Sequence, residues 1–200
     1  MASITATLAT LVAAGVVGHS VQGRPIELVH VAGPGPRVLV VGCVHGDECA
    51  GLAVVAALRR AQPQEDLWLV PTLNPDGLAA HTRANAHGVD LNRSFPGGRE
   101  PETRAAVALI RRLRPDVTIW FHQHEDRVRG YGRSQAAARR FAALAGMRYA
   151  RVAWPPGAVT RWQNGLGERS FVVELPAGRL GGDLLGREVR ACLRVALAAP

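Results

Sequence analysis

The chain has 200 residues, of which 48% are hydrophobic and 20% are charged. That length and balance predict one globular domain and exclude a disordered or fibrous chain. The net charge is +8 and all 24 basic residues are arginine, but they are scattered along the chain, and aromatic residues make up only 5%. Proteins that bind nucleic acid gather their basic residues on one surface, so the composition predicts no nucleic-acid partner.

The N-terminal segment from Ala2 to Gly18 is uncharged and mostly small or apolar. No apolar run in the chain reaches the about 18–20 residues that a membrane-spanning helix needs. Residues 1–17 are interpreted either as a leader, although the positive start of such signals is absent, or as a helix at the domain edge. A leader would direct the protein to the cell envelope or outside, and without one it would be cytoplasmic. Residues 18–200 are predicted to form a single domain.

Short apolar runs alternate with amphipathic ones along the rest of the chain. Strands are predicted at residues 26–31, 37–44, 67–73, 117–121, 147–153 and 170–175. Helices are predicted at residues 47–61, with Asp47 as the cap, at 101–113, at 135–144 and after Gly181–Asp183. Residues 74–77 read as a turn. This alternation predicts an α/β fold with a sheet covered on both faces.

The cysteines are Cys43, Cys49 and Cys192, an odd number that excludes a complete set of internal disulfides. We interpret all three as small buried hydrophobic residues. Cys43 precedes His45 by two positions on the same face of a strand. The alternative interpretation is therefore that Cys43 acts as a thiolate ligand of a metal ion.

Candidate metal ligands follow two of the predicted strands. His45 and Glu48 are three positions apart at a strand-to-helix turn, and His122 ends a later strand. A catalytic zinc ion takes three protein ligands and leaves one position open, and the carboxyl ends of strands are where α/β proteins place ligands. The competing interpretation is a capped helix start with an exposed Glu. His124 is a second candidate for the third ligand.

The loop from Arg83 to Pro96 carries two arginines and two asparagines among Gly and Pro residues. Arginine presents a planar fork that matches a carboxylate, and asparagine adds a neutral donor. The loop is therefore either an anion-binding segment or an ordinary solvated loop.

Five segments occur in an order that resembles the zinc carboxypeptidase family (M14-type metallocarboxypeptidases), nearest its short bacterial branch with the murein peptide amidases. They are Gly18–Ile26, His45–Glu48, Asn74–Gly77, Gly88–Pro96 and Val173–Pro176. The resemblance covers the chain from about Gly18 to Gly178 and implies a mostly parallel or mixed twisted sheet of about eight strands between helices.

The resemblance also implies roles for individual residues. His45, Glu48 and His122 would hold one Zn²⁺ per chain, and Glu174 would be the general base. Arg83 would stabilise the oxyanion, and Asn92 with Arg93 would bind the free terminal carboxylate of a peptide or murein-peptide substrate. Asp90 is either an outer partner of a ligand or a turn residue.

The chain departs from the family pattern in several places. Ser94 replaces an Asn, the 96–102 loop is short, and His122 is followed by a more charged run, residues 123–126. Asn164 occupies the region where pancreatic-type relatives carry a mobile Tyr, and we take it as a substitute substrate contact.

Three functions are consistent with these motifs. The favoured one is a zinc metallocarboxypeptidase or amidase, a hydrolase that cleaves the C-terminal bond of a peptide or a cell-wall peptide. The second is an N-acyl amino acid deacylase of the succinylglutamate desuccinylase/aspartoacylase type, which shares the metal triad. The third is a non-catalytic module that binds carboxylates.

Overall fold

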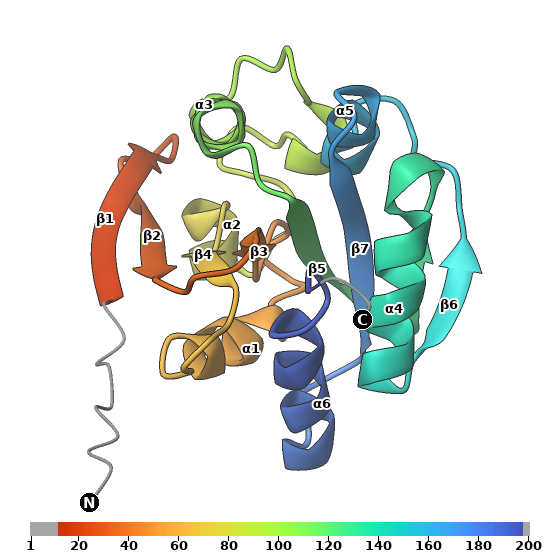
Figure 1. The fold of residues 1–200 in the computed structure, drawn as a ribbon. Helices are drawn as coiled ribbons and strands as arrows, with labels where there is room; N and C mark the ends of the chain where they lie inside the picture. Colours follow the sequence, from red (N-terminus) through yellow and green to blue (C-terminus); the bar gives the residue numbers. More distant parts are fainter. Residues whose placement is uncertain (1–11, 198–200) are drawn as a thin grey trace, which may run out of the picture.

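A twisted mixed sheet forms the centre of the molecule, and helices cover both of its faces (Figure 1). The computed structural model describes residues 12–197. The strands are β1 Val12–His19, β2 Pro25–Val31, β3 Arg37–Val41, β4 Asp66–Val70, β5 Val117–Gly130, β6 Arg148–Arg151 and β7 Arg169–Pro176. The helices are α1 Gly51–Leu58, α2 Pro75–Ala80, α3 Pro101–Leu113, α4 Gln135–Ala145, α5 Val159–Gly165 and α6 Gly182–Cys192. The predicted α/β fold class is confirmed, with seven assigned strands where about eight were expected.

Both faces of the sheet are buried because its central strands contain uninterrupted apolar runs, such as residues 38–41 of β3. Val38 and Val40 of β3 pack on the side of α1, α4 and α6, whereas Leu39 and Val41 pack on the side of α3 and α5. Successive side chains of a strand point to opposite faces, so an uninterrupted apolar run fills two cores at once.

β5 passes on both sides of β7 and accounts for the missing eighth strand. Residues 117–124 pair with β7 in the parallel direction, and residues 127–129 pair with it in the antiparallel direction. Asp126 adopts the left-handed conformation (φ 49°) within this reversal, a conformation that Asp tolerates better than most residues. Two separate strand segments therefore flank β7, and the second also pairs with β6.

Two predicted segments differ from the structure. Residues 12–17 lie in β1, which pairs antiparallel with β2 at the sheet edge, so they do not form the edge helix, and the leader stays a prediction. Residues 1–11 of that prediction lie outside the described residues. Residues 74–77 begin α2 rather than forming an isolated turn, because the Asn74 side chain accepts a hydrogen bond from Gly77 N (2.9 Å) and caps the helix.

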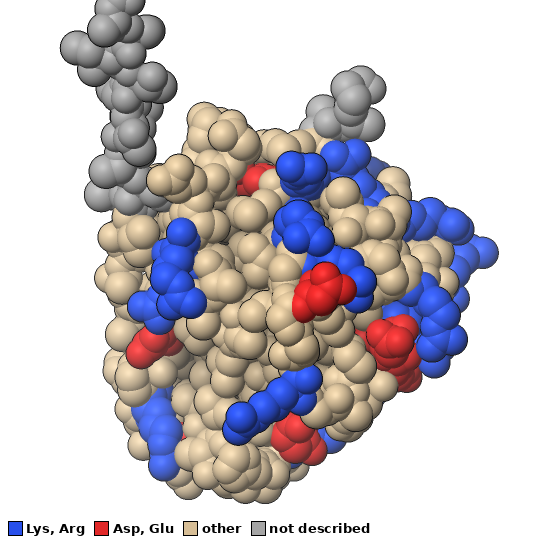
Figure 2. All heavy atoms as spheres, turned by 90° about the horizontal axis from the view of Figure 1, so that it is seen from below, with Lys and Arg blue, Asp and Glu red and all other residues tan. Residues whose placement is uncertain are grey.

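The first helix also begins later than predicted. α1 starts at Gly51, its N-cap position is Ala50, and Asp47 is exposed in the preceding turn. Among residues 12–197 no helix is both long and apolar enough to cross a membrane. On the face drawn in Figure 2, arginine side chains are spread over the surface with acidic side chains among them.

Candidate active site

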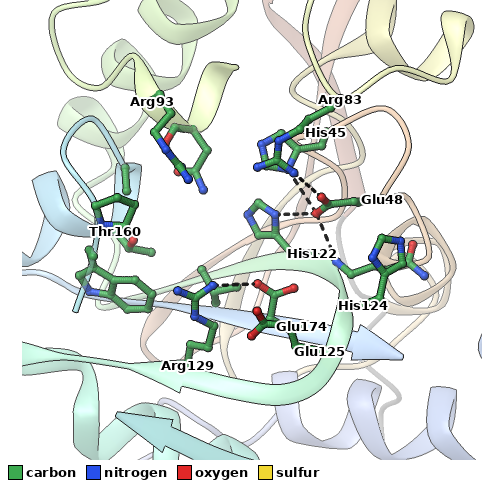
Figure 3. Close-up of a pocket in the computed structure, with 16 residues that line it drawn as sticks. His45, Glu48, Arg83, Arg93, His122, His124, Glu125, Arg129, Thr160 and Glu174 are labelled. Carbon is green, nitrogen blue, oxygen red and sulfur yellow. Dashed lines mark hydrogen bonds and ion pairs between the residues drawn. The ribbon is translucent and has the colours of Figure 1, made fainter. Parts of the chain in front are cut away.

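His45, Glu48 and His122 meet beyond the carboxyl ends of β3 and the first half of β5. All three are buried, and their ligand atoms lie within 4.8 Å of one another. Glu48 Oε2 is 3.2 Å from His45 Nδ1 and 3.0 Å from His122 Nδ1. Figure 3 shows the two imidazoles and the carboxylate directed toward one another. The three residues proposed as ligands from the sequence are thus brought together.

This cluster fits a divalent metal ion. The Nδ1 atoms of His45 and His122 both face Glu48 Oε2, so two imidazole nitrogens and a carboxylate oxygen converge on one point. All three residues are buried, and a divalent ion could be held among these atoms. Two imidazoles and one carboxylate also form one of the ligand sets of catalytic zinc sites.

The electrostatics of the cluster favour a carboxylate surrounded by imidazoles. Burial alone would raise the pKa of Glu48, but hydrogen bonds from His122 and His45 outweigh it and hold that pKa far below its usual value. Burial lowers the pKa of His122. A neutral His122 and an ionised Glu48 are the forms that bind metal ions.

Asp90 connects the metal cluster to Arg83. Its Oδ1 lies 2.9 Å from His45 Nε2, and its Oδ2 accepts from Arg83 Nε at 3.1 Å. Arg83 also donates to Glu48. Burial opposes protonation of His45, but the bonds to Asp90 and Glu48 raise its pKa. Asp90 therefore meets both interpretations, because its Oδ1 also accepts from Asn92 N at 2.9 Å and caps the helical turn Leu91–Arg93.

Glu174 faces the cluster from the end of β7, the strand that pairs with His122 of β5. Its side chain is buried, and it accepts a hydrogen bond from Arg129 at 3.2 Å. Burial, together with the charge of Glu125, raises the pKa of Glu174 to about 7, against the lowering effect of Arg129. A carboxyl group with a pKa in this range exchanges protons near neutral pH.

Asn92 and Arg93 line the same pocket. Asn92 is buried and accepts a hydrogen bond from Val159 N at 3.1 Å, which links the Arg83–Pro96 loop to α5. Arg93 is exposed and donates to the Asn92 carbonyl at 2.9 Å. In Figure 3 its guanidinium group extends into the pocket opposite Glu174.

A pocket of about 370 Å³ contains these groups. Its lining includes the predicted residues His45, Glu48, Arg83, Asn92, Arg93, His122 and Glu174, and His124, which stands outside the His45–Glu48–His122 cluster. It also includes Arg129, Trp154 and Thr160, which the sequence did not single out. Arg129 could have been found only by knowing that β5 reverses direction.

Asn164, predicted as a substrate contact, is not among the residues that line this pocket. Its amide nitrogen donates to the Thr160 and Ser170 carbonyls, both at 2.8 Å, and its oxygen accepts from Ser134 N at 3.1 Å. These hydrogen bonds to backbone groups join α5 to β7, so the Asn164 side chain has a structural role.

Cys43 and Cys49 form a disulfide across the ligand loop. The bond encloses His45 and Glu48 within one short covalent ring, and both sulfurs lie 3.3 Å from the His45 carbonyl oxygen. The interpretation of both residues as separate buried hydrophobes is therefore wrong, and a disulfide sulfur is not the thiolate that a metal ligand requires. Cys192 is free and buried, as expected.

The mixed sheet and the helices on its two faces form an α/β fold of the carboxypeptidase-like kind. Solved structures with this fold include murein-tripeptide amidase from Escherichia coli O157, with a TM-score of 0.77, 23% identity and coverage of 96% of this chain and 95% of that chain. A metallo-carboxypeptidase from Burkholderia cenocepacia matches with a TM-score of 0.76, 20% identity and coverage of 93% and 64%. A succinylglutamate desuccinylase from Silicibacter sp. TM1040 matches with a TM-score of 0.74, 18% identity and coverage of 92% and 65%.

Sequence comparison identifies relatives of the same kind. Murein peptide amidase A of Escherichia coli K12 is 31% identical over 141 residues, covering 52% of this chain and 57% of that protein. Carboxypeptidase SOL1 of Arabidopsis thaliana is 31% identical over 136 residues, covering 53% of this chain and 28% of that protein. Residues 34–115 match the model of the succinylglutamate desuccinylase/aspartoacylase catalytic domain. Over about half of its length the chain is thus similar to murein peptide amidases and carboxypeptidases, the kind of protein that its motifs resemble, and it spans 57% and 28% of the lengths of these two relatives.

Proposed function

We propose that this protein is a zinc-dependent hydrolase that cleaves the amide bond next to a free terminal carboxylate, as a carboxypeptidase or a peptide amidase. One observation carries the proposal. A single pocket contains a buried His–Glu–His cluster, a buried carboxyl group with a raised pKa, and an arginine aimed inward. The names of the relatives support the hydrolase class.

His45, Glu48 and His122 would hold the ion. When bound, Zn²⁺ lowers the pKa of water at such a site and polarises a carbonyl group. Glu174 would accept a proton from the attacking water as its oxygen bonds to the carbonyl carbon. It would then return that proton to the nitrogen as the carbon–nitrogen bond breaks, so that the products are a carboxylate and an amine.

Arg93 and Arg83 would each bind a different negative group of the substrate. Arg93, with the Asn92 side chain beside it, would hold the terminal carboxylate of the substrate, which an internal peptide bond lacks. Arg83 would donate to the oxyanion of the tetrahedral intermediate, a kind of contact whose loss typically costs about 2.7–4 kcal/mol in the transition state.

An N-acyl amino acid deacylase is the second candidate. It is favoured by the match of residues 34–115 to the desuccinylase/aspartoacylase model, a segment that includes both His45 and Glu48. The product of such a reaction also carries a free carboxylate beside the cleaved bond, so the pocket suits both substrates.

Metal analysis and a substrate panel test these assignments together. The wild-type protein should contain close to one zinc per chain, and His45→Ala and His122→Ala should each lose it while His124→Ala keeps it. The panel compares C-terminal dipeptides, a murein tripeptide and N-acyl amino acids. Hydrolysis of the N-acyl amino acids alone would favour the deacylase, and hydrolysis of none would contradict both enzymatic functions.

Glu174→Gln tests the role of the base. Gln keeps the shape of the side chain but cannot accept the proton, so we expect the zinc content to be unchanged and kcat to fall about 10²- to 10⁴-fold. Zinc measured beside the rate separates loss of chemistry from loss of metal. Wild-type activity in this variant would exclude Glu174 as the base.

A further inference from the structure

The disulfide between Cys43 and Cys49 joins the two ends of the turn that carries two of the proposed zinc ligands. Cys43 lies two residues after the end of β3, and Cys49 lies two residues before the start of α1. The bond closes a covalent ring over residues 43–49, which contains both His45 and Glu48. The third ligand, His122, lies outside the ring on β5. A change at this bond would therefore act on two of the three ligands at once.

Both sulfurs contact the backbone of the ligand turn itself. Each lies 3.3 Å from the His45 carbonyl oxygen, and Glu48 N donates to the same oxygen at 3.0 Å. A site that is already restrained in its binding conformation loses less conformational freedom when the metal binds, and this raises its affinity. Opening the ring would remove a restraint of this kind, because the chain between the two cysteines would gain freedom.

The two cysteines differ in their access to solvent. Cys43 is fully buried, whereas Cys49 is half-buried. Cys49 lines a cavity of about 420 Å³ whose other side is formed by Gly178, Arg179 and Leu180, between β7 and α6. Gly178 and Arg179 are exposed, so this cavity opens to solvent. Cys49 is not part of the active-site lining, so a reductant would reach it without entering the substrate pocket.

We propose that the Cys43–Cys49 bond is a redox modification site, at which a dithiol reductant lowers the zinc affinity of the His45–Glu48–His122 cluster. The proposal rests on the metal centre of the function proposed above but not on hydrolysis. It assigns the disulfide the control of metal binding, in addition to any contribution to the stability of the fold.

The exchange takes place in two steps. A thiolate of the dithiol attacks Cys49 Sγ, the sulfur–sulfur bond breaks, and Cys43 leaves as a thiolate that takes up a proton. The second thiol of the reductant then loses its proton and attacks the mixed disulfide, which releases Cys49 as a thiolate that is protonated in turn. The protein gains two electrons and two protons, and the dithiol loses the same number and becomes a disulfide. Glutathione disulfide would reverse the reaction and restore the ring.

Zinc affinity measured in both redox states tests the proposal. The wild-type protein is reduced with dithiothreitol, separated from it under argon because dithiothreitol itself binds zinc, and titrated against a competing chelator. We expect zinc binding to weaken about 10-fold on reduction, because the ligand turn must then be ordered by the metal. Treatment with glutathione disulfide should restore the original affinity. Circular dichroism of the metal-free protein in both states verifies that the fold is kept.

Two variants control for effects of the treatment itself. The double variant Cys43→Ala/Cys49→Ala cannot form the ring, so it should bind zinc as the reduced wild type does and should not respond to either reagent. Cys192→Ala is the matched control, since Cys192 is the free, buried cysteine at the end of α6. It keeps the ring and should respond to both reagents as the wild type does.

The single variants test the point of attack. Cys43→Ala leaves Cys49 as a free thiol, and Cys49→Ala leaves Cys43. An aromatic disulfide reagent added to the folded, metal-free proteins should modify Cys49 rapidly and Cys43 only after unfolding, because Cys43 is fully buried. Faster modification of Cys43 would contradict attack through the cavity beside Cys49.

The outcomes separate this proposal from the hydrolase function. Equal zinc affinities in the two redox states, tighter binding after reduction, or free thiols at both positions after treatment with glutathione disulfide would overturn the redox site and leave the hydrolase intact. A redox-dependent zinc affinity in a protein that hydrolyses none of the substrates would support the redox site alone. Absence of zinc binding in both states would overturn both proposals.

Discussion

Asp90 is the residue on which both His45 and Arg83 depend for orientation. It accepts from His45 Nε2 at 2.9 Å, which leaves Nδ1 facing Glu48 and His122. A carboxylate behind a metal-ligating histidine fixes the ring orientation and raises the basicity of the ligand. A change at Asp90 should therefore act on the metal without removing a ligand.

Asp90→Asn is expected to weaken zinc binding about 10- to 100-fold, because the neutral amide is a poorer acceptor for the imidazole. Competition with a chelator measures the affinity directly. Asp47→Asn serves as the control, since Asp47 is an exposed acid in the ligand loop itself. Equal affinities in the wild type and Asp90→Asn would show that the contact to His45 has no influence on the metal.

Among the pocket residues, the ones that could be predicted from the sequence belong to short motifs. His45 and Glu48 are three positions apart, so a single turn sets their relative placement, and His122 ends a strand whose neighbour in the sheet is β3. Arg129 and Thr160 carry no such local pattern, because a reversal of β5 and the packing of α5 bring them to the pocket. Asn164 lies outside the pocket lining, because its short side chain bonds to backbone groups.

Among the elements, α2 supports the metal-ligand loop through close backbone contact. A Cβ atom added at Gly46 would lie 1.9 Å from the Gly77 carbonyl carbon, so only glycine fits between His45 and the start of α2. Gly77 in turn is fixed by the Asn74 cap, whose amide nitrogen also donates to the Ala84 carbonyl beside Arg83 at 3.2 Å.

Gly46→Ala should push the ligand loop away from α2. We expect about 1–3 kcal/mol of destabilisation, the usual range for overpacking, together with a clear loss of zinc affinity. Thermal unfolding with and without zinc measures both, because bound metal raises the stability of the folded state. Gly15→Ala, where no atom lies within 4 Å of the added Cβ, should behave as the wild type. Unchanged zinc affinity in Gly46→Ala would contradict this account of the loop.

The long-range pairing of elements explains what sequence reasoning missed in the fold. Strands β2, β3, β4 and β7 have strong apolar patterns and were predicted within a few residues. β1 has exposed small residues and is a strand because β2 pairs with it. The Cys43–Cys49 bond likewise depends on a loop conformation that an odd cysteine count does not reveal.

Over the whole molecule, two buried glutamates should make stability depend on pH. The Glu65 and Glu188 carboxylates are fully buried and lack hydrogen-bond partners among residues 12–197. Burial raises the pKa of Glu188 to about 8 and that of Glu65 to about 7. Folding therefore favours their protonated forms, and the unfolded chain releases those protons from about pH 4.5 upward. Their stabilising contribution is complete below about pH 4.5 and is lost as the pH rises through 7 and 8.

Glu188→Gln should remove most of this dependence. At pH 8.5 we expect the variant to be more stable than the wild type, with a gain of at most about 5 kcal/mol for a group shifted from 4.5 to about 8. Denaturant unfolding at pH 5 and pH 8.5 measures the difference. Glu27→Gln, which alters an exposed acid on β2, should keep the wild-type slope. The same slope in Glu188→Gln would show that Glu188 is ionised in the folded protein without penalty.

Because β5 runs along both sides of β7, one continuous segment supplies groups to two parts of the site. Eight consecutive residues begin with a proposed zinc ligand, His122, and end with Arg129, which donates to Glu174 on the strand between them. An insertion or deletion in this stretch would therefore shift the ligand and the partner of the proposed base together. Among relatives that keep the site, changes of length should be confined to loops outside this stretch.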